Sequence, residues 1–150
     1  MAKQGREYGG ALDQLLELTM LLSADMERGL GELGLTGPRT HLLWVVHHQG
    51  PSTQRVLADA LGVSARNITG LVDALVDTGF VTREPHPTDR RATLVSLTKH
   101  GATVMTQMAA DHAELAEGLF GGLGPRQFGA FVTTMTTVLD ELRRRVEEAR

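Results

Sequence analysis

The chain has 150 residues, of which 41% are hydrophobic, enough for one compact domain or for a subunit that completes its core against a partner. Charged residues make up 22% and the net charge is -3, a balance that argues against a disordered chain and against a uniformly basic nucleic-acid coat protein. Cysteine is absent, which excludes disulfides, thiolate zinc sites, cysteine nucleophiles and thiol redox switches. No apolar run has the roughly 18 to 20 residues of a membrane span, and the N-terminus lacks a secretory signal, so we expect a cytoplasmic protein.

Acidic and basic residues are unevenly distributed along the chain. Residues 1–51 carry 4 basic and 6 acidic side chains, and residues 101–150 carry 5 and 7, whereas residues 52–100 carry 6 and 5. The middle third is therefore the only one without an acidic excess. This distribution favours contact between the middle third and something anionic.

The first third of the chain predicts two helices. Over 11–33, leucines and a methionine recur mostly three and four residues apart, the spacing that aligns side chains on one face of a helix. A break follows in which Thr36 or Gly37 can act as N-cap and Pro38 suits the first helical turn. We therefore expect a second helix over 38–49.

The middle third predicts two short helices joined by a tight turn. Ser52 or Thr53 can cap a helix over 54–61, and Ser64 can cap the next helix, which ends near residue 79. Gly62 between them tolerates the positive φ that a tight turn needs.

A β-hairpin is predicted next. Residues 80–82 and 93–97 are short, β-branched and nearly alternating, and the segment between them is rich in proline and turn residues. We expect the tip of this hairpin to be long, polar and basic.

Two further helices complete the expected fold. Thr98 can cap the first of them, and Pro125 opens the second, which carries a long apolar stripe. The predicted class is mainly α, an α+β winged helix-turn-helix with about six helices and a two-stranded β-wing. A small central module cannot bury the apolar stripes of both terminal segments, which favours a homodimer with two-fold symmetry.

The spacing of Ala58, Gly62 and Ile68 is typical of a helix-turn-helix. The two helices cross closely, so a small residue such as Ala58 is needed at the contact, and Ile68 anchors the second helix on the first. An ordinary helical hairpin remains the alternative at this point. A hairpin that directly follows the motif favours a winged DNA-binding module, with its second helix in the major groove.

The start of the second helix offers the side chains expected to contact DNA. Arginine pairs with guanine and asparagine with adenine, while serine and threonine suit phosphates or either base. The alternative is an ordinary solvated face. The candidates, with two residues at the start of the preceding helix, are Ser64, Arg66, Asn67, Thr69, Thr53 and Gln54.

At the wing tip, Arg90 and Arg91 present two guanidinium groups, the side chains favoured in a narrow minor groove. Asp89 would repel DNA, so we expect it to accept hydrogen bonds from Arg91 or from loop N–H groups and to fix the shape of the tip. A charged turn without a partner is the alternative for this short segment.

The run Asp89-x-Arg91-x-x-x-Val95-x-Leu97-Thr98, followed by Gly101, resembles the wing signature of the MarR family of bacterial transcriptional regulators. The similarity is most specific over about residues 54–101. It implies a single domain over 1–150, with a winged lobe at 38–100 and dimerisation helices at 11–33 and 102–148. It also implies a pseudo-palindromic operator of double-stranded DNA and a small, frequently aromatic or phenolic effector. Arg91 would enter the minor groove, braced by Asp89, and the exposed residues of the second motif helix would face the major groove.

The family resemblance implies an effector pocket between the dimerisation helices and the DNA-binding lobe. Residues that could supply aromatic, polarizable and titratable surface there are Trp44, His47, His48, Met108 and His112. A core role for the tryptophan and methionine, with satisfied or exposed histidines, stays open as the alternative. The histidine spacing matches no zinc pattern, so we expect no metal and no cofactor.

No sequence motif of an enzyme is present, so we expect no catalytic activity. We predict a sequence-specific DNA-binding transcriptional regulator, a repressor that a small molecule releases. The alternative is a winged-helix protein-interaction module without DNA binding. Such modules tend to lose basic residues on the wing and the second motif helix, whereas Arg66, Arg90 and Arg91 are present here.

Overall fold

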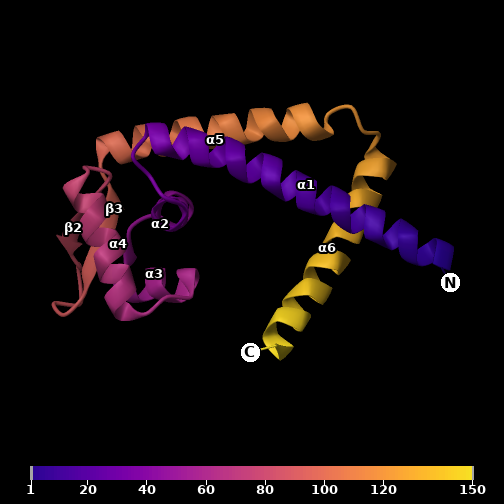
Figure 1. The fold of residues 1–150 in the computed structure, drawn as a ribbon. Helices are drawn as coiled ribbons and strands as arrows, with labels where there is room; N and C mark the ends of the chain where they lie inside the picture. Colours follow the sequence, from indigo (N-terminus) through magenta and orange to yellow (C-terminus); the bar gives the residue numbers. More distant parts are fainter. Residues whose placement is uncertain (1, 150) are drawn as a thin grey trace. The chain divides into compact units, whose positions relative to one another are not determined.

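The structure, a computed structural model, describes residues 2–149, and Figure 1 shows its elements in chain order. The predicted mainly α class, with helices before and after the β-wing in the sequence, is confirmed. One compact unit extends to Met105 and a second begins at Thr106. The helices and strands of the described residues are α1 (Ala2–Glu32), α2 (Gly37–Gln49), β1 (Ser52–Thr53), α3 (Gln54–Leu61), α4 (Ala65–Asp77), β2 (Val81–Pro85), β3 (Thr93–Leu97), α5 (Lys99–Phe120) and α6 (Pro125–Glu148).

The core of the first unit lies among α2, α3, α4 and the sheet. Its completely buried side chains come from all of these elements, so the short helices are held by burial of their apolar faces rather than by their own propensity. Side-chain caps at Thr53, Ser64 and Thr98 fix where α3, α4 and α5 start, as predicted, whereas Thr36 makes no side-chain cap hydrogen bond before α2. The core side chains with no exposed surface are Leu42, Leu43, Leu57, Val72, Leu75 and Val95, with Met105 of α5.

The wing is part of a sheet with one more strand than predicted. Strands β2 and β3 pair antiparallel, from Val81 opposite Leu97 to Pro85 opposite Thr93. The short β1 pairs with the other side of β3, which gives the order β1-β3-β2. The sequence predicted caps and, for Thr53, a DNA contact at the β1 residues, but no strand, because a two-residue strand is defined by a partner some forty residues away and has no pattern of its own.

Helix α1 begins at Ala2, so the prediction that it begins at residue 11 is wrong. The glycines at 5, 9 and 10 do not prevent this earlier start, because a glycine costs a helix only about 1 kcal/mol relative to alanine. Most large apolar side chains of α1 are exposed, and burial returns only at Leu30 and at Leu35 beyond the helix end. None of the helices in the part of the chain described is long and apolar enough to cross a membrane.

The second unit consists of the later part of α5 and α6. Phe120 near its turn lies with its ring centroid 5.5 Å from those of both Phe128 and Phe131. No described residue of α6 is buried. Its apolar stripe is therefore uncovered within the described residues, and it comprises Phe128, Phe131, Val132, Val138, Leu139, Leu142 and Val146.

The start of α5 packs closely against the chain that follows α4. The hydroxyl of Thr98 accepts a hydrogen bond from the N–H of Gly101 at 3.0 Å, which confirms the predicted cap, and donates to the carbonyl of Gly79 at 2.5 Å. Gly101 is buried, and a Cβ atom at this position would overlap the carbonyl oxygen of Phe80. Only glycine permits this approach.

Candidate nucleic-acid interface

The predicted helix-turn-helix is formed by α3 and α4. Ala58 is 8% exposed and Ile68 is 1% exposed, consistent with the close crossing that the sequence spacing implied. Gly62 has a φ of +65° in the left-handed region, and the N–H of Val63 donates to the carbonyl of Ala58 at 3.0 Å. The side chain of Thr53 caps α3 by accepting from the N–H of Val56 at 3.3 Å. These local bonds hold the two helices in a fixed relation.

The first turns of α4 present exposed polar side chains with different duties. Ser64 caps the helix, its hydroxyl accepting from the N–H of Asn67 at 3.1 Å. The hydroxyl of Thr69 donates to the carbonyl of Ala65 at 2.9 Å. Within residues 2–149, the side chains of Arg66 and Asn67 have no hydrogen-bond partner. They are therefore the groups on this helix that remain available for an external partner.

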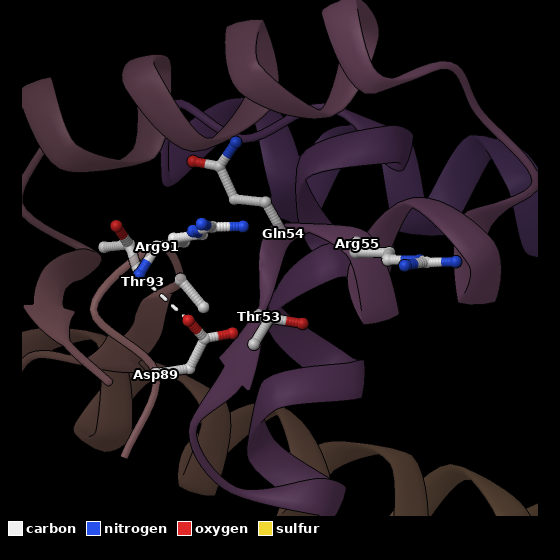
Figure 2. A pocket seen from close by; sticks show the side chains of 7 residues that line it. Thr53, Gln54, Arg55, Asp89, Arg91 and Thr93 are labelled. Atoms are coloured by element: carbon white, nitrogen blue, oxygen red, sulfur yellow. Dashed lines mark hydrogen bonds between the residues drawn. The ribbon is translucent and has the colours of Figure 1, made fainter. Parts of the chain in front are cut away.

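The wing tip is organised by two side chains that accept backbone hydrogen bonds, of which Figure 2 draws that of Asp89. A carboxylate oxygen of Asp89 accepts from the N–H of Arg91 at 2.9 Å, so its partner is a loop N–H group and not a guanidinium. His86 Nδ1 accepts from the N–H groups of Thr88 and Asp89 at 3.2 and 3.1 Å. His86 was not selected from the sequence, although its place between two prolines in the predicted tip was a usable signal.

A polar hollow of about 450 Å³ lies between the start of α3 and the wing tip (Figure 2). Arg55 lines it although sequence analysis did not select this residue. Its position directly after the predicted contacts at 53 and 54, on the first turn of a helix, was the available signal. The lining residues are Thr53, Gln54, Arg55, Asp89, Arg91, Ala92 and Thr93.

Arg83 on β2 also escaped sequence analysis. Its Nε donates to Oε1 of Gln54 at 3.1 Å, and its Nη2 lies 2.5 Å from Oδ1 of Asp73. The amide nitrogen of Gln54 in turn donates to the hydroxyl of Thr69 at 3.1 Å. These four residues come from β2, α3 and α4, and neither composition nor spacing indicated that they meet.

Four exposed arginines of α3, α4 and the wing have no ion pair within residues 2–149: Arg55, Arg66, Arg90 and Arg91. Two more groups in the same unit, Arg83 and Asp73, neutralise each other. An exposed guanidinium without an internal carboxylate retains its full attraction for an external anion. The helix-turn-helix and the wing therefore form a surface suited to phosphate and to the acceptor edges of bases.

Three of the five residues predicted to contact an effector form a cluster of rings on α2. Trp44, His47 and His48 lie together on α2, with ring centroids 5.1 to 5.9 Å apart. Met108 and His112 lie one turn apart on α5, in the second compact unit. A pocket shared by the two sets stays a prediction. Among the residues described, no three histidine or carboxylate side chains are grouped to hold a metal ion.

Known proteins resemble the chain in sequence and in fold. Residues 33–92 match the model of the MarR family. The HTH-type transcriptional repressor IacR of Pseudomonas putida is 30% identical over 103 residues, which are 69% of this chain and 62% of IacR. The match thus spans less than two thirds of the length of that relative.

Two solved structures show the same architecture. RV1404 of Mycobacterium tuberculosis has a TM-score of 0.71 and 28% identity over 85% of this chain and 89% of its own. MepR of S. aureus, solved in a complex with DNA, has a TM-score of 0.62 and 22% identity over 85% of this chain and 98% of its own. Residues 33–92, which contain the helix-turn-helix and the wing tip, therefore form a MarR-family segment of this chain, as the resemblance of the wing predicted.

Proposed function

We propose that the chain is a sequence-specific, double-stranded DNA-binding transcriptional regulator. The observation that carries this proposal is the group of four exposed arginines on the helix-turn-helix and the wing that have no internal ion pair. The names of relatives such as IacR support a regulator, and MepR supports DNA as a partner that the same fold accepts.

The side chains divide the work of binding according to their partners inside the protein. Arg66 and Asn67 are exposed and unpaired within the described chain, so they read base edges in the major groove. Arg90 and Arg91 follow the minor groove or the adjacent backbone. The start of α3, with the positive end of the helix dipole and Arg55, holds a phosphate. In this division Ser64 and Asp89 act indirectly, through the shapes of the helix start and the wing tip.

The regulator works as a homodimer built from α1, the later part of α5, and α6. The exposed apolar stripe of α6 and the exposed leucines and methionines of α1 are the surfaces that a second copy covers. Helix α4 is the recognition helix, and the two copies of it lie about 34 Å apart in the dimer. They enter successive major grooves on one side of the duplex, which requires a pseudo-palindromic operator. Such a dimer acts in the cytoplasm, where a bacterial chromosome is found.

We further propose that the regulator is a repressor released by a small aromatic or phenolic effector. Relatives named as repressors support the direction of control. The aromatic cluster of Trp44, His47 and His48 supports an effector with a flat, apolar ring. We propose Met108 and His112 as further effector contacts.

Selection of binding sites from a random pool of duplex DNA tests the proposal. We expect an inverted repeat whose half-sites are centred about one helical turn apart, bound with an affinity that falls steeply as salt rises. Recovery of no enriched sequence, together with weak binding that does not depend on salt, would instead support the protein-interaction module.

A further inference from the structure

The chain of polar contacts from the wing strand to the recognition helix gives Gln54 a role that exposure alone does not suggest. Both ends of its side-chain amide are occupied: Oε1 accepts from Arg83 and Nε2 donates to Thr69. One N–H and one lone pair of the amide remain, but the two internal contacts fix its orientation, so it is not free to turn toward a base. Gln54 is therefore poorly suited to the direct base contact expected from the sequence.

The contacts of Thr69 and Arg83 extend this chain in both directions. The hydroxyl hydrogen of Thr69 is given to the carbonyl of Ala65, so the oxygen is oriented to accept from Gln54. Arg83, 32% exposed, is held at its other end by Asp73, which lies one turn beyond Thr69 on α4. The result is a loop of contacts that leaves α4, crosses α3, reaches β2 and returns to α4.

From this loop we infer that Gln54 and Asp73 are positioning residues that fix the recognition helix relative to the wing, and so set sequence selectivity without contacting bases. The inference rests on the proposed DNA-binding function. Helix α4 and the wing read different grooves, and both readings succeed together only at one relative orientation. Packing fixes the buried side of α4, whereas the contacts of Gln54 with Thr69 and of Arg83 with Asp73 fix its exposed side.

Asp73 is a carboxylate near the proposed DNA surface, and this gives two explanations to separate. One predicts a gain in affinity for every duplex when its charge is removed, and the other predicts a loss of selectivity. If Asp73 only repels DNA, Asp73→Asn tightens binding to every duplex. If Asp73 positions Arg83, the same change lowers selectivity for the operator over a scrambled duplex. Asp77→Asn is the matched control, since it removes the same charge from an exposed position one turn further along α4 with no ion pair in the described chain.

We expect Asp73→Asn and Gln54→Ala each to lower the ratio of operator to scrambled-duplex affinity by about three- to tenfold, the range of one hydrogen bond. Asp77→Asn should leave the ratio unchanged. Thr69→Val should behave like Gln54→Ala, and Thr69→Ser should retain wild-type selectivity because it keeps the hydroxyl. A double-mutant cycle of Gln54→Ala with Arg83→Gln should show that the two effects are not additive.

A measurement without DNA keeps the inference testable on its own. The Nε–H proton of Arg83 should exchange slowly with water in the wild type and faster in Gln54→Ala, with the helical content unchanged. A selective wild type whose Gln54→Ala and Asp73→Asn variants match Asp77→Asn would overturn the inference alone. A wild type without selectivity would overturn the proposed function and this inference with it.

Discussion

The arginines of the DNA-binding surface and those at the end of α6 are both exposed, but their partners differ. Arg143, Arg144 and Arg145 each pair with a carboxylate three or four residues away on α6. Hydrogen bonds from Arg144 and then Arg145 lower the pKa of the Glu141 carboxyl, and the bond to Glu141 raises the pKa of Arg144. Arginines that pair with carboxylates on their own helix stabilise that helix, whereas arginines without an ion pair in the described chain are available to an external partner.

The two compact units also differ in how far each buries its own apolar side chains. In the first unit, α2, α3, α4 and the sheet bury a common core. In the second unit α6 buries no described residue and exposes a stripe of seven large apolar side chains. The winged lobe therefore completes its own core, while the second unit leaves its apolar stripe uncovered within the described residues. The variants below challenge this contrast, beginning with the largest expected effect.

Val138→Glu places a charge in the middle of the α6 stripe. We expect the dimer to dissociate, and operator affinity to fall by about a hundredfold or more because two linked half-site contacts become separate ones. Sedimentation and operator titration measure the two effects. Thr137→Glu, one residue away and exposed on another face of α6, is the matched control. A Val138→Glu protein that stayed dimeric would show that α6 does not form the interface.

Gly101→Ala tests the packing within the lobe. The added Cβ would overlap the carbonyl of Phe80, and we expect a loss of about 1 to 3 kcal/mol in the free energy of unfolding. Gly118→Ala, on the same helix with open space around it, should instead stabilise the protein by about 0.5 to 1 kcal/mol. Urea denaturation measures both changes, and equal effects would remove the packing explanation.

Arg91→Ala removes one of the unpaired arginines. We expect affinity for operator and for random duplex to fall together, by about tenfold, with a salt dependence lower by about one phosphate contact. Asn67→Ala should instead relax base preference at one operator position. Arg144→Ala, which removes a paired arginine, should leave DNA affinity unchanged. Equal losses for Arg91→Ala and Arg144→Ala would erase the distinction between the two groups.

His86→Ala removes the acceptor of two backbone N–H groups at the wing tip. We expect a severalfold loss of DNA affinity without loss of overall stability, since one hydrogen-bond acceptor is worth about 1 kcal/mol and the tip is exposed. His86→Asn places an amide oxygen near the position of Nδ1 and should restore most of the affinity. Titration of both variants with operator DNA decides whether the acceptor matters.

The smallest effect concerns the paired arginines of α6. Because the pKa of Glu141 is lowered, its contribution to stability is present above the ordinary value of 4.5 and is lost as the pH falls below it. We expect Glu141→Gln to reduce the thermal stability slightly at pH 7 and to converge with the wild type in acid. The group is exposed, so the difference should be small. A difference in thermal stability between Glu141→Gln and the wild type that stayed constant at all pH values would show that ionisation of Glu141 is not its cause.

Local signals in the sequence predicted most of the lobe. The hydroxyls of Thr53, Ser64 and Thr98 cap the helices that they were expected to cap, and Gly62 adopts the left-handed conformation of the predicted turn. Each of these features depends on residues within three or four positions. Helix caps and tight turns can be predicted from a single sequence for that reason.

Features that depend on distant residues could not be predicted in this way. The contact between Gln54 and Arg83 spans 29 positions, and the strand at Ser52 is defined by its pairing with Val95. We accordingly propose an internal bridging role for Gln54, for which the sequence predicted a DNA contact. For Asp89, the sequence left two hydrogen-bond partners open, and only the folded loop selects the N–H of Arg91.

The wing tip has a further consequence for the speed of binding. Because His86 and Asp89 already organise the loop through its own N–H groups, Arg90 and Arg91 sit on a backbone that needs little additional ordering when it meets a duplex. The conformational entropy lost on association is then confined mainly to the two long side chains. Encounter should accordingly be governed by diffusion and electrostatic steering rather than by slow folding of the wing.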